Sequence, residues 1–329
     1  MSRALTPYRE LQLPHPPALL YNNLQLHQSG TYVSYAADSA VYTIRPSTGA
    51  LCFSPLRFPG GHVHHLASLQ DDAEQNIILI IVLSTRVAVI AVNGQQTHML
   101  PVKDDHATLT CAAVVRVAGK NEMVVAVGSS DGIPLCSRYT LQGQPVPSVE
   151  LTMPVQAHAR RSITALDLEA LGETSQVEMA SGDSGGHVVL WADNNPTLMI
   201  PPESDTDAVT CLRLVAVRNA VAVAYGGGQI RLIQCSSGAV IINIQAHSRW
   251  INAMVYSAAQ HWLVSGAEDG QLSVWDVTSA NPTSVCLASG DLRNELPTGL
   301  AFLGDQGALL VASYDVAKLR FFSTPCKGR

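Results

Sequence analysis

The chain has few charged and few aromatic side chains. Charged residues make up 14% of its 329 residues and aromatic residues 5%, whereas hydrophobic residues make up 47%. An average soluble domain carries about 25% charged residues, so this composition predicts that extensive sheet buries most of the backbone. The formal net charge is −6 and there is no basic block. These features argue against nucleic acid as the main partner and against an electrostatic membrane anchor.

Thiol motifs and long apolar runs are also missing. The seven cysteines are scattered and never spaced C-x-x-C, which argues against a disulfide framework and a thiolate zinc site. The first 17 residues contain no apolar core of a signal peptide. The longest uninterrupted apolar run, 77–83, is far shorter than the about 20 residues that a membrane-spanning helix needs. We therefore expect no membrane insertion and a cytoplasmic location with reduced thiols.

Short apolar runs rich in Val, Ile, Leu and Ala recur along the chain, each bounded by Gly, Asn, Asp, Pro or Ser. This pattern is typical of an all-β protein. The clearest unit begins at His247 and continues through an apolar strand at 251–255, the turn residue Asp269 and a strand ending at Trp275. His247 lies 28 residues before Trp275, and Asp269 lies six before it.

The unit recurs along the chain. The position at which its third strand ends is repeated at intervals of 46, 47, 54, 42, 42 and 46 residues, and propeller blades of this kind run about 40–45 residues. The longest interval contains a Pro-rich stretch, 143–154, which is interpreted as a loop insertion. The residues at the repeated position are Ile44, Ile90, Ser137, Trp191, Ile233, Trp275 and Phe321.

The unit around His247 resembles the WD repeat, which forms one blade of a β-propeller and is marked by a His, a Ser on the second strand, a turn Asp and a Trp on the third. The resemblance implies that His247, Ser265, Asp269 and Trp275 join in one buried, structural hydrogen-bonded network. A buried carboxylate needs donors, and an imidazole can accept on one side and donate on the other.

A second unit matches the same pattern less completely. His158, Ser181 and Trp191 occupy the corresponding positions, but Gly185 stands where the turn Asp is expected. The network in this blade is therefore expected to be incomplete. The resemblance to the WD-repeat family is good over 156–323 and poor in the first half of the chain.

These observations predict an all-β chain that forms one seven-bladed WD-repeat β-propeller. The propeller is expected to span 18–324, with an N-terminal segment at 1–17 and a tail at 325–329. The last blade has only three strands of its own, so the segment Arg9–Leu13 is expected to supply the fourth and close the ring, which removes free sheet edges. A count of six or eight blades stays open, because the first two blades carry little of the repeat.

Two motifs suggest chemistry, and both have simpler interpretations. Residues 182–186 read Gly-Asp-Ser-Gly-Gly, the nucleophile motif of trypsin-like proteases, so a serine hydrolase using Ser184 is a remote alternative. A tight turn between two blade strands explains the same residues. His62, His64 and His65 could hold a metal, but three or four converging ligands are needed and only a polar loop is evident. We expect no catalytic residues, no metal and no cofactor.

The function predicted is a non-catalytic scaffold that binds partner proteins or peptides. In propellers of this kind the loop that leads into an innermost strand faces the top of the disc, beside the central channel. Arg160 and Arg161 lie in one such loop and Arg249 and Trp250 in another, where they could hold an acidic or phosphorylated peptide. Alternatively, Trp250 packs between blades and the arginines are only solvated. An alternative function is a stable structural or assembly subunit of a ciliary or flagellar complex.

Overall fold

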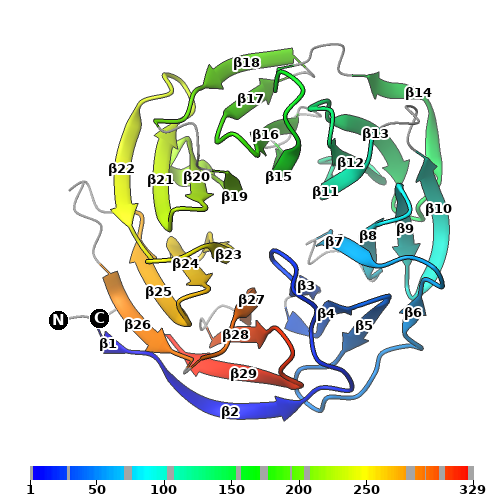
Figure 1. Cartoon of the computed structure of the whole chain (residues 1–329). Helices are drawn as coiled ribbons and strands as arrows, with labels where there is room; N and C mark the ends of the chain where they lie inside the picture. The colour runs from blue at the N-terminus through cyan, green and yellow to red at the C-terminus, as the bar shows by residue number, and fades with distance from the viewer. Residues whose placement is uncertain are drawn as a thin grey trace.

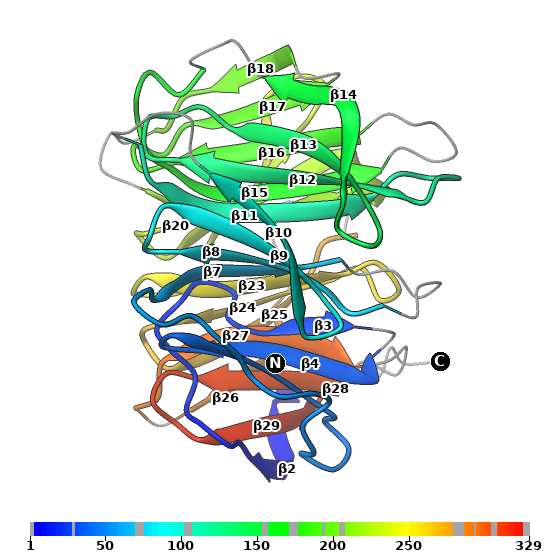
Figure 2. The ribbon, with the colours of Figure 1, turned by 90° about the vertical axis from the view of Figure 1, so that its right-hand side faces the viewer.

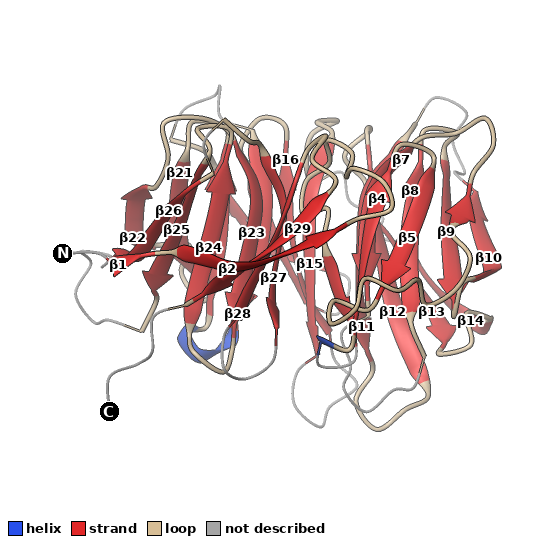
Figure 3. Ribbon diagram, turned by 90° about the horizontal axis from the view of Figure 1, so that it is seen from below, coloured by secondary structure: helices blue, strands red, loops and turns tan. Residues whose placement is uncertain are grey.

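A computed structural model of the chain describes residues 3–27, 30–69, 76–101, 107–152, 157–170, 177–192, 195–203, 208–278, 286–292, 294–303 and 308–324. Its strands form seven separate sheets arranged in a ring around a central channel (Figure 1). Seen edge-on, the ring is a disc with connecting loops on its two faces (Figures 2 and 3). The prediction of an all-β, seven-bladed propeller is confirmed.

Each blade contains four antiparallel strands, and in blades 1 to 6 these four strands follow one another in sequence from the channel outward. Blade 1 contains β3 (Gln25–His27), β4 (Tyr32–Ala37), β5 (Ala40–Ile44) and β6 (Leu56–Arg57), and blade 2 contains β7 (Val63–Ser68), β8 (Ile78–Leu83), β9 (Val87–Val92) and β10 (Gln95–Pro101). Blade 3 contains β11 (Leu109–Arg116), β12 (Glu122–Ser129), β13 (Leu135–Thr140) and β14 (Pro145–Thr152).

The remaining blades repeat this plan. Blade 4 contains β15 (Ile163–Ala170), β16 (Val177–Asp183), β17 (Val188–Ala192) and β18 (Asn195–Ile200). Blade 5 contains β19 (Val209–Val215), the 3-10 turn η2 (Ala216–Arg218), β20 (Ala220–Tyr225), β21 (Gln229–Gln234) and β22 (Val240–Gln245). Blade 6 contains β23 (Ile251–Ser257), β24 (Trp262–Ala267), β25 (Gln271–Asp276) and β26 (Cys286–Asp291). Blade 7 contains β27 (Pro297–Leu303), β28 (Ala308–Ser313) and β29 (Lys318–Ser323).

An N-terminal strand closes the ring, as predicted. Strand β2 (Thr6–Gln12) pairs antiparallel with β29 and becomes the outermost strand of blade 7. Glu10 on β2 forms ion pairs with Lys318 and Arg320 on β29. A second N-terminal strand, β1 (Arg3–Ala4), pairs parallel with β26 as a fifth strand of blade 6. The first residues therefore hold the first and last parts of the chain together.

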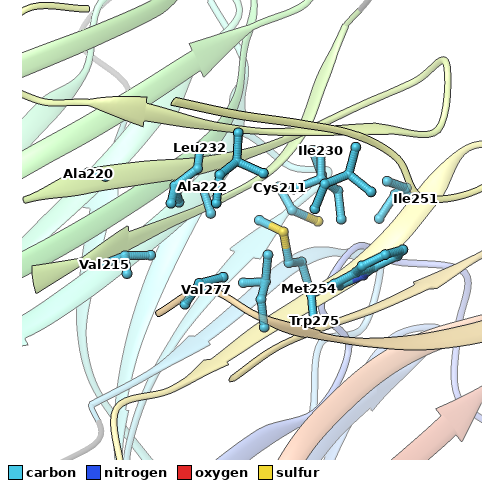
Figure 4. Packing of buried hydrophobic residues seen from close by; sticks show 14 of the residues in the cluster. Cys211, Val215, Ala220, Ala222, Ile230, Leu232, Ile251, Met254, Trp275 and Val277 are labelled. Carbon is cyan, nitrogen blue, oxygen red and sulfur yellow. The ribbon is translucent and has the colours of Figure 1, made fainter. Parts of the chain in front are cut away.

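The hydrophobic core consists of layers between neighbouring blades. Strands in the middle of a blade are covered on both faces by neighbouring blades. Every residue of β8 and of β24 is therefore buried. The outer strand β18 alternates between exposed and less exposed positions. Figure 4 shows one layer, in which Ile230 and Leu232 of blade 5 pack against Met254 and Trp275 of blade 6.

No helix in the described part of the chain has the length and apolar character of a membrane span.

A β-bulge recurs near the start of the innermost strand in six of the seven blades. In each case one residue has no partner on the second strand, so the ladder shifts by one. The extra residue is polar in all six strands, and this polar repeat was not recognised in the sequence. The bulged residues are His64, Thr110, Thr164, Thr210, Asn252 and Thr298.

Candidate interaction face

The residues predicted for partner binding lie in loops of one face of the disc. We define the top face as the side that carries the turn between the second and third strands of each blade and the loop that leads into each innermost strand. The bottom face is the opposite side. On the top face, each turn lies beside the loop of the neighbouring blade. A Cβ atom added to Gly132 of blade 3, for example, would come within 2.9 Å of the Arg161 carbonyl oxygen in the loop before blade 4.

In blade 6 the four residues that the WD resemblance implies are bonded to one another. The hydroxyl of Ser265 lies 2.7 Å from Nε2 of His247 and accepts a hydrogen bond of 3.1 Å from the indole N–H of Trp275. The other ring nitrogen of His247 lies 3.1 Å from Oδ1 of Asp269. The network thus ties the loop before β23 to the second strand, the third strand and the turn between them.

Blade 4 contains a complete network, which corrects the expectation of an incomplete one. His158 lies 2.7 Å from the hydroxyl of Ser181 and 2.9 Å from Oδ2 of Asp183, and Trp191 donates to Ser181 across 2.7 Å. The carboxylate comes from the last residue of β16 and not from the turn position, where Gly185 stands. Asp183 also accepts the backbone N–H of Gly185 at 2.8 Å, so one carboxylate holds both the histidine and the turn.

The arrangement of partners fixes the protons in these networks. An ionised carboxylate only accepts, so Nδ1 of each histidine carries the proton and Nε2 accepts from the serine hydroxyl. Burial acts to raise the pKa of Asp183, but hydrogen bonds, first from His158, outweigh it and hold the pKa below its usual value. Burial lowers the pKa of His247 against the opposing effect of Asp269. The first effect favours a charged carboxylate in blade 4, and the second favours a neutral imidazole in blade 6.

Among the described residues, the side chain of Ser184 forms no hydrogen bond with a histidine or a carboxylate. Ser184 is exposed in the turn after β16, and its backbone N–H donates to the carbonyl oxygen of Ser162. His158 uses both ring nitrogens for Ser181 and Asp183, and Nδ1 of His187, in the same turn as Ser184, lies 3.4 Å from Oδ1 of Asp183. The Gly-Asp-Ser-Gly-Gly sequence therefore serves as a strand end and turn of the blade.

Blade 5 lacks the histidine network and contains a buried arginine in its place. Arg231 on β21 is 5% exposed. Its guanidinium bonds to Glu203 at 2.8 Å and to Gln229 at 2.9 Å, and it lies 4.9 Å from the ring centroid of Tyr225. Glu203 belongs to the loop before blade 5, so this ion pair also ties a top-face loop to a third strand. Sequence reasoning missed it, although a lone Arg inside the apolar run 230–233 was a usable signal.

Three of the four residues predicted for partner binding are exposed on the top face. Arg160, Arg161 and Arg249 all lie in loops that lead into innermost strands, of blades 4 and 6. Among the described residues none of the three forms an ion pair. Arg160 has a positive φ of 62°, and the next backbone N–H donates to the carbonyl oxygen of His158. The blade 4 network thus anchors the loop that presents two arginines.

Of the two interpretations of Trp250, the structure agrees with the one in which it packs between blades. It is half-buried, and a Cβ atom added to Gly226 of blade 5 would lie 2.6 Å from its ring. Its ring also stacks on Tyr21, with centroids 6.4 Å apart and an interplanar angle of 16°. Trp250 therefore packs between blade 5, blade 6 and the N-terminal segment, and it supports the loop that carries Arg249.

The segment between β2 and β3, residues 13–24, crosses the top face towards the channel (Figure 1). Asn22 lies at its inner end with a positive φ of 51°. Its backbone N–H donates to the backbone carbonyl oxygen of Asn252. Its side-chain oxygen accepts a hydrogen bond of 3.0 Å from the backbone N–H of Met254. Its side-chain nitrogen lies 3.4 Å from the sulfur of Cys211. Asn22 therefore links the innermost strands of blades 5 and 6.

The histidines considered as metal ligands do not come together. His62 is exposed and lies 2.6 Å from Asp38 in the turn of blade 1, while His64 is the bulged residue of β7. Nδ1 of His65 accepts the backbone N–H of Ala112 at 3.2 Å. Across the described ranges, no three His, Cys, Asp or Glu side chains form a group that could hold a metal ion.

The ring of seven blades and the His–Ser–Asp–Trp networks define a WD-repeat β-propeller, a class of proteins that act as protein-interaction scaffolds. Solved structures share the fold. A chain of the crystal structure of the Mitotic Checkpoint Complex matches 97% of this chain and 94% of its own length with a TM-score of 0.72 and 19% identity. The crystal structure of Chaetomium thermophilum Raptor matches 96% of this chain and 30% of its own, with a TM-score of 0.71 and 13% identity.

The family model described as WDR54 matches residues 77–325, and the chain belongs to this family. WD repeat-containing protein 54 of Mus musculus is 27% identical over 207 residues, which cover 61% of this chain and 60% of the mouse protein. The protein of the same name from Homo sapiens is 26% identical with the same coverage. The matched region therefore spans about 60% of the length of these relatives. Nuclear distribution protein nudF of Aspergillus niger is 28% identical over 40% of this chain and 29% of its own.

Proposed function

We propose that the top face binds an acidic segment of a partner protein through Arg160, Arg161 and Arg249. The observation that carries this proposal is the exposure of three guanidinium groups around the mouth of the channel, none of which has an ion-pair partner among the described residues. Guanidinium groups recognise carboxylate and phosphate groups through two parallel hydrogen bonds. A peptide with acidic or phosphorylated side chains fits this arrangement.

Rigid attachment of the loops supports the proposal. Arg161 packs over the turn of its own blade, since a Cβ atom added to Gly185 would lie 2.7 Å from its Cδ atom. The loop before blade 6 is held in the same way, because a Cβ atom on Gly228 of blade 5 would lie 3.0 Å from the carbonyl oxygen of Arg249. Less ordering entropy is lost on binding when the contacting residues are already fixed.

The test compares partner recovery by a top-face variant and a matched variant. The top-face variant carries Arg160→Gln, Arg161→Gln and Arg249→Gln. The control carries Arg45→Gln, Lys120→Gln and Arg218→Gln, which removes the same charge from the bottom face, at the loop after β5, the loop after β11 and the turn η2. After affinity purification from cells and mass spectrometry, we expect the control to keep the main partners and the top-face variant to lose them.

Retention of the same partners by both variants would reject the top face as the binding site. Phosphatase treatment of the lysate separates two kinds of acidic partner, because it abolishes binding to phosphorylated side chains and leaves binding to Asp and Glu. The proposed location is the cytoplasm, and microscopy of the full chain carrying a fluorescent tag tests it. No contact among the described residues favours the ciliary subunit or the Ser184 hydrolase over the scaffold, so neither is proposed here.

A further inference from the structure

The central channel contains a cavity of about 300 Å³ lined by innermost strands of all seven blades. Small-molecule pockets usually measure about 300–1,000 Å³. Asn22, at the inner end of the segment that crosses the top face, lies at one end of the cavity. The opposite end is formed by half-buried apolar side chains near the ends of the innermost strands, among them Val115, Leu168, Tyr256 and Phe302. The cavity is thus roofed at the top face and has an apolar rim towards the bottom face.

Several polar side chains in the channel have a structural role. The innermost strand of each blade has one free edge, and its backbone N–H groups need acceptors. Nδ1 of His65 in blade 2 accepts a hydrogen bond from the backbone N–H of Ala112 in blade 3. Oδ2 of Asp167 in blade 4 accepts one from the backbone N–H of Leu214 in blade 5 at 2.6 Å. These contacts explain why a histidine and an aspartate line the channel.

The same contacts leave donors in the cavity. Because Nδ1 of His65 accepts, its proton must lie on Nε2, which has no acceptor among the described residues. Burial, and then the charge of Arg213, lowers the pKa of His65 to about 4, so the ring is neutral at physiological pH. Arg213 lines the cavity too, and its Nη1 donates to the carbonyl oxygen of Leu212 at 2.7 Å.

Arg213 has no ion-pair partner among the described residues. Asp167 lies within electrostatic reach of Arg213: burial raises the pKa of its carboxyl group, and the charge of Arg213 acts to lower it. Asp167 stands four residues after the first residue of β15, as Arg213 does in β19. A half-buried guanidinium without a bonded carboxylate is costly, and an anionic ligand would relieve this cost.

We propose that the channel binds a small zwitterion, an α-amino acid with an apolar side chain, whose carboxylate is held by Arg213 and whose ammonium group faces Asp167. The Nε2–H of His65 is a further donor for the carboxylate. The apolar side chain lies against the rim that includes Leu168 and Phe302. Charges of both signs at one level of the channel, with apolar side chains beyond them, match the three parts of such a molecule.

Calorimetric titration of the unmodified chain with L-leucine and two blocked analogues tests the proposal. N-acetyl-L-leucine lacks the ammonium group, and L-leucine amide lacks the carboxylate. We expect L-leucine to bind and each analogue to bind at least about tenfold weaker, the factor that corresponds to 1.4 kcal/mol. Absence of L-leucine binding, or equal binding of N-acetyl-L-leucine, would overturn the proposal, the second outcome by indicating a simple anion site.

Variants assign the binding to the channel. Arg213→Gln is expected to weaken L-leucine binding at least about tenfold, and Asp167→Asn to weaken it as well while keeping an oxygen for the N–H of Leu214. Arg218→Gln, in the same blade but outside the cavity lining, is the control and should bind as the unmodified chain does. Unchanged binding by folded Arg213→Gln would place the ligand elsewhere and overturn the proposal. The analogue series decides the question if that variant does not fold.

Discussion

The imidazole of His158 donates from Nδ1 to the carboxylate of Asp183 across 2.9 Å, and both side chains are fully buried. This pair continues through Ser181 to the indole of Trp191, so one chain of hydrogen bonds crosses blade 4 from the top-face loop to the third strand. Each donor polarises the next, and a fully satisfied network of this kind favours one arrangement of the blade. The network also fixes the loop that presents Arg160 and Arg161.

Asp183→Ala is expected to lower the free energy of unfolding by about 3 kcal/mol, because its removal leaves the buried Nδ1–H of His158 without an acceptor. The backbone N–H groups of Gly185 and His187, which donate to Asp183, lose their acceptor as well. Chemical denaturation monitored by tryptophan fluorescence measures the change. Ser184→Ala, at the exposed neighbouring position, is the control and should unfold as the unmodified chain does. An Asp183→Ala variant of unchanged stability would show that the network contributes nothing to stability.

Much of the fold follows from a period that is visible in the sequence. The position near the end of the third strand recurs at intervals of 42 to 54 residues, and six of the seven residues there are large and apolar. The spacing fails for Asp183, because a carboxylate at the end of a strand reaches the same histidine as one in the turn two residues later. A search for Asp at a fixed distance before Trp191 finds only Gly185.

The candidate site was less predictable, because its contacts join distant parts of the chain. Asn22 and Met254 are bonded although 232 residues separate them, and no local pattern marks such a pair. For Trp250 the sequence left open whether the ring is exposed beside Arg249 or packs between blades. Its burial depends on the absence of a side chain at Gly226 in the previous blade, which the residues around Trp250 do not reveal.

The stability of the chain is expected to fall as the pH is lowered from about 6.5, the usual pKa of histidine, to about 4. The pKa of His65 is lowered to about 4 in the folded chain, so over this interval the unfolded state binds a proton that the folded state does not. The contribution of His65 to stability is therefore fully present above its pKa in the unfolded chain, and it is lost as the pH falls towards its pKa in the folded chain. The loss from this group is at most about 3 kcal/mol, because its ring is partly accessible from the channel.

Denaturant midpoints measured from pH 7 to pH 4 check this dependence, with His65→Gln as the comparison. Glutamine supplies an oxygen for the N–H of Ala112 and does not titrate, so its profile should be shallower. His27, whose pKa burial lowers to about 3, contributes in the same direction in both proteins. Identical slopes for the two proteins would contradict the role given to His65.

Gly226→Ala is expected to displace the Trp250 ring and to lower the free energy of unfolding by about 1–3 kcal/mol, the usual cost of an added methyl group in a packed site. The new Cβ atom would lie 2.6 Å from the ring. A double-mutant cycle with Trp250→Ala measures the coupling. In the Trp250→Ala background the methyl group should cost much less, and equal costs in both backgrounds would show that the two residues do not meet.

Asn22→Ala is expected to lower the free energy of unfolding by about 1–3 kcal/mol, because the buried N–H of Met254 loses its acceptor. The effect should spread to the top face, since the neighbouring Tyr21 stacks on Trp250. Amide hydrogen exchange locates the change: protection should fall at Met254, while strands of blade 3, which Asn22 does not contact, should exchange as before. Asn22→Asp keeps an acceptor oxygen and serves as the matched variant. If it restores protection at Met254, the acceptor is the cause, and equal loss of protection in both variants would assign the effect to the backbone of residue 22 instead.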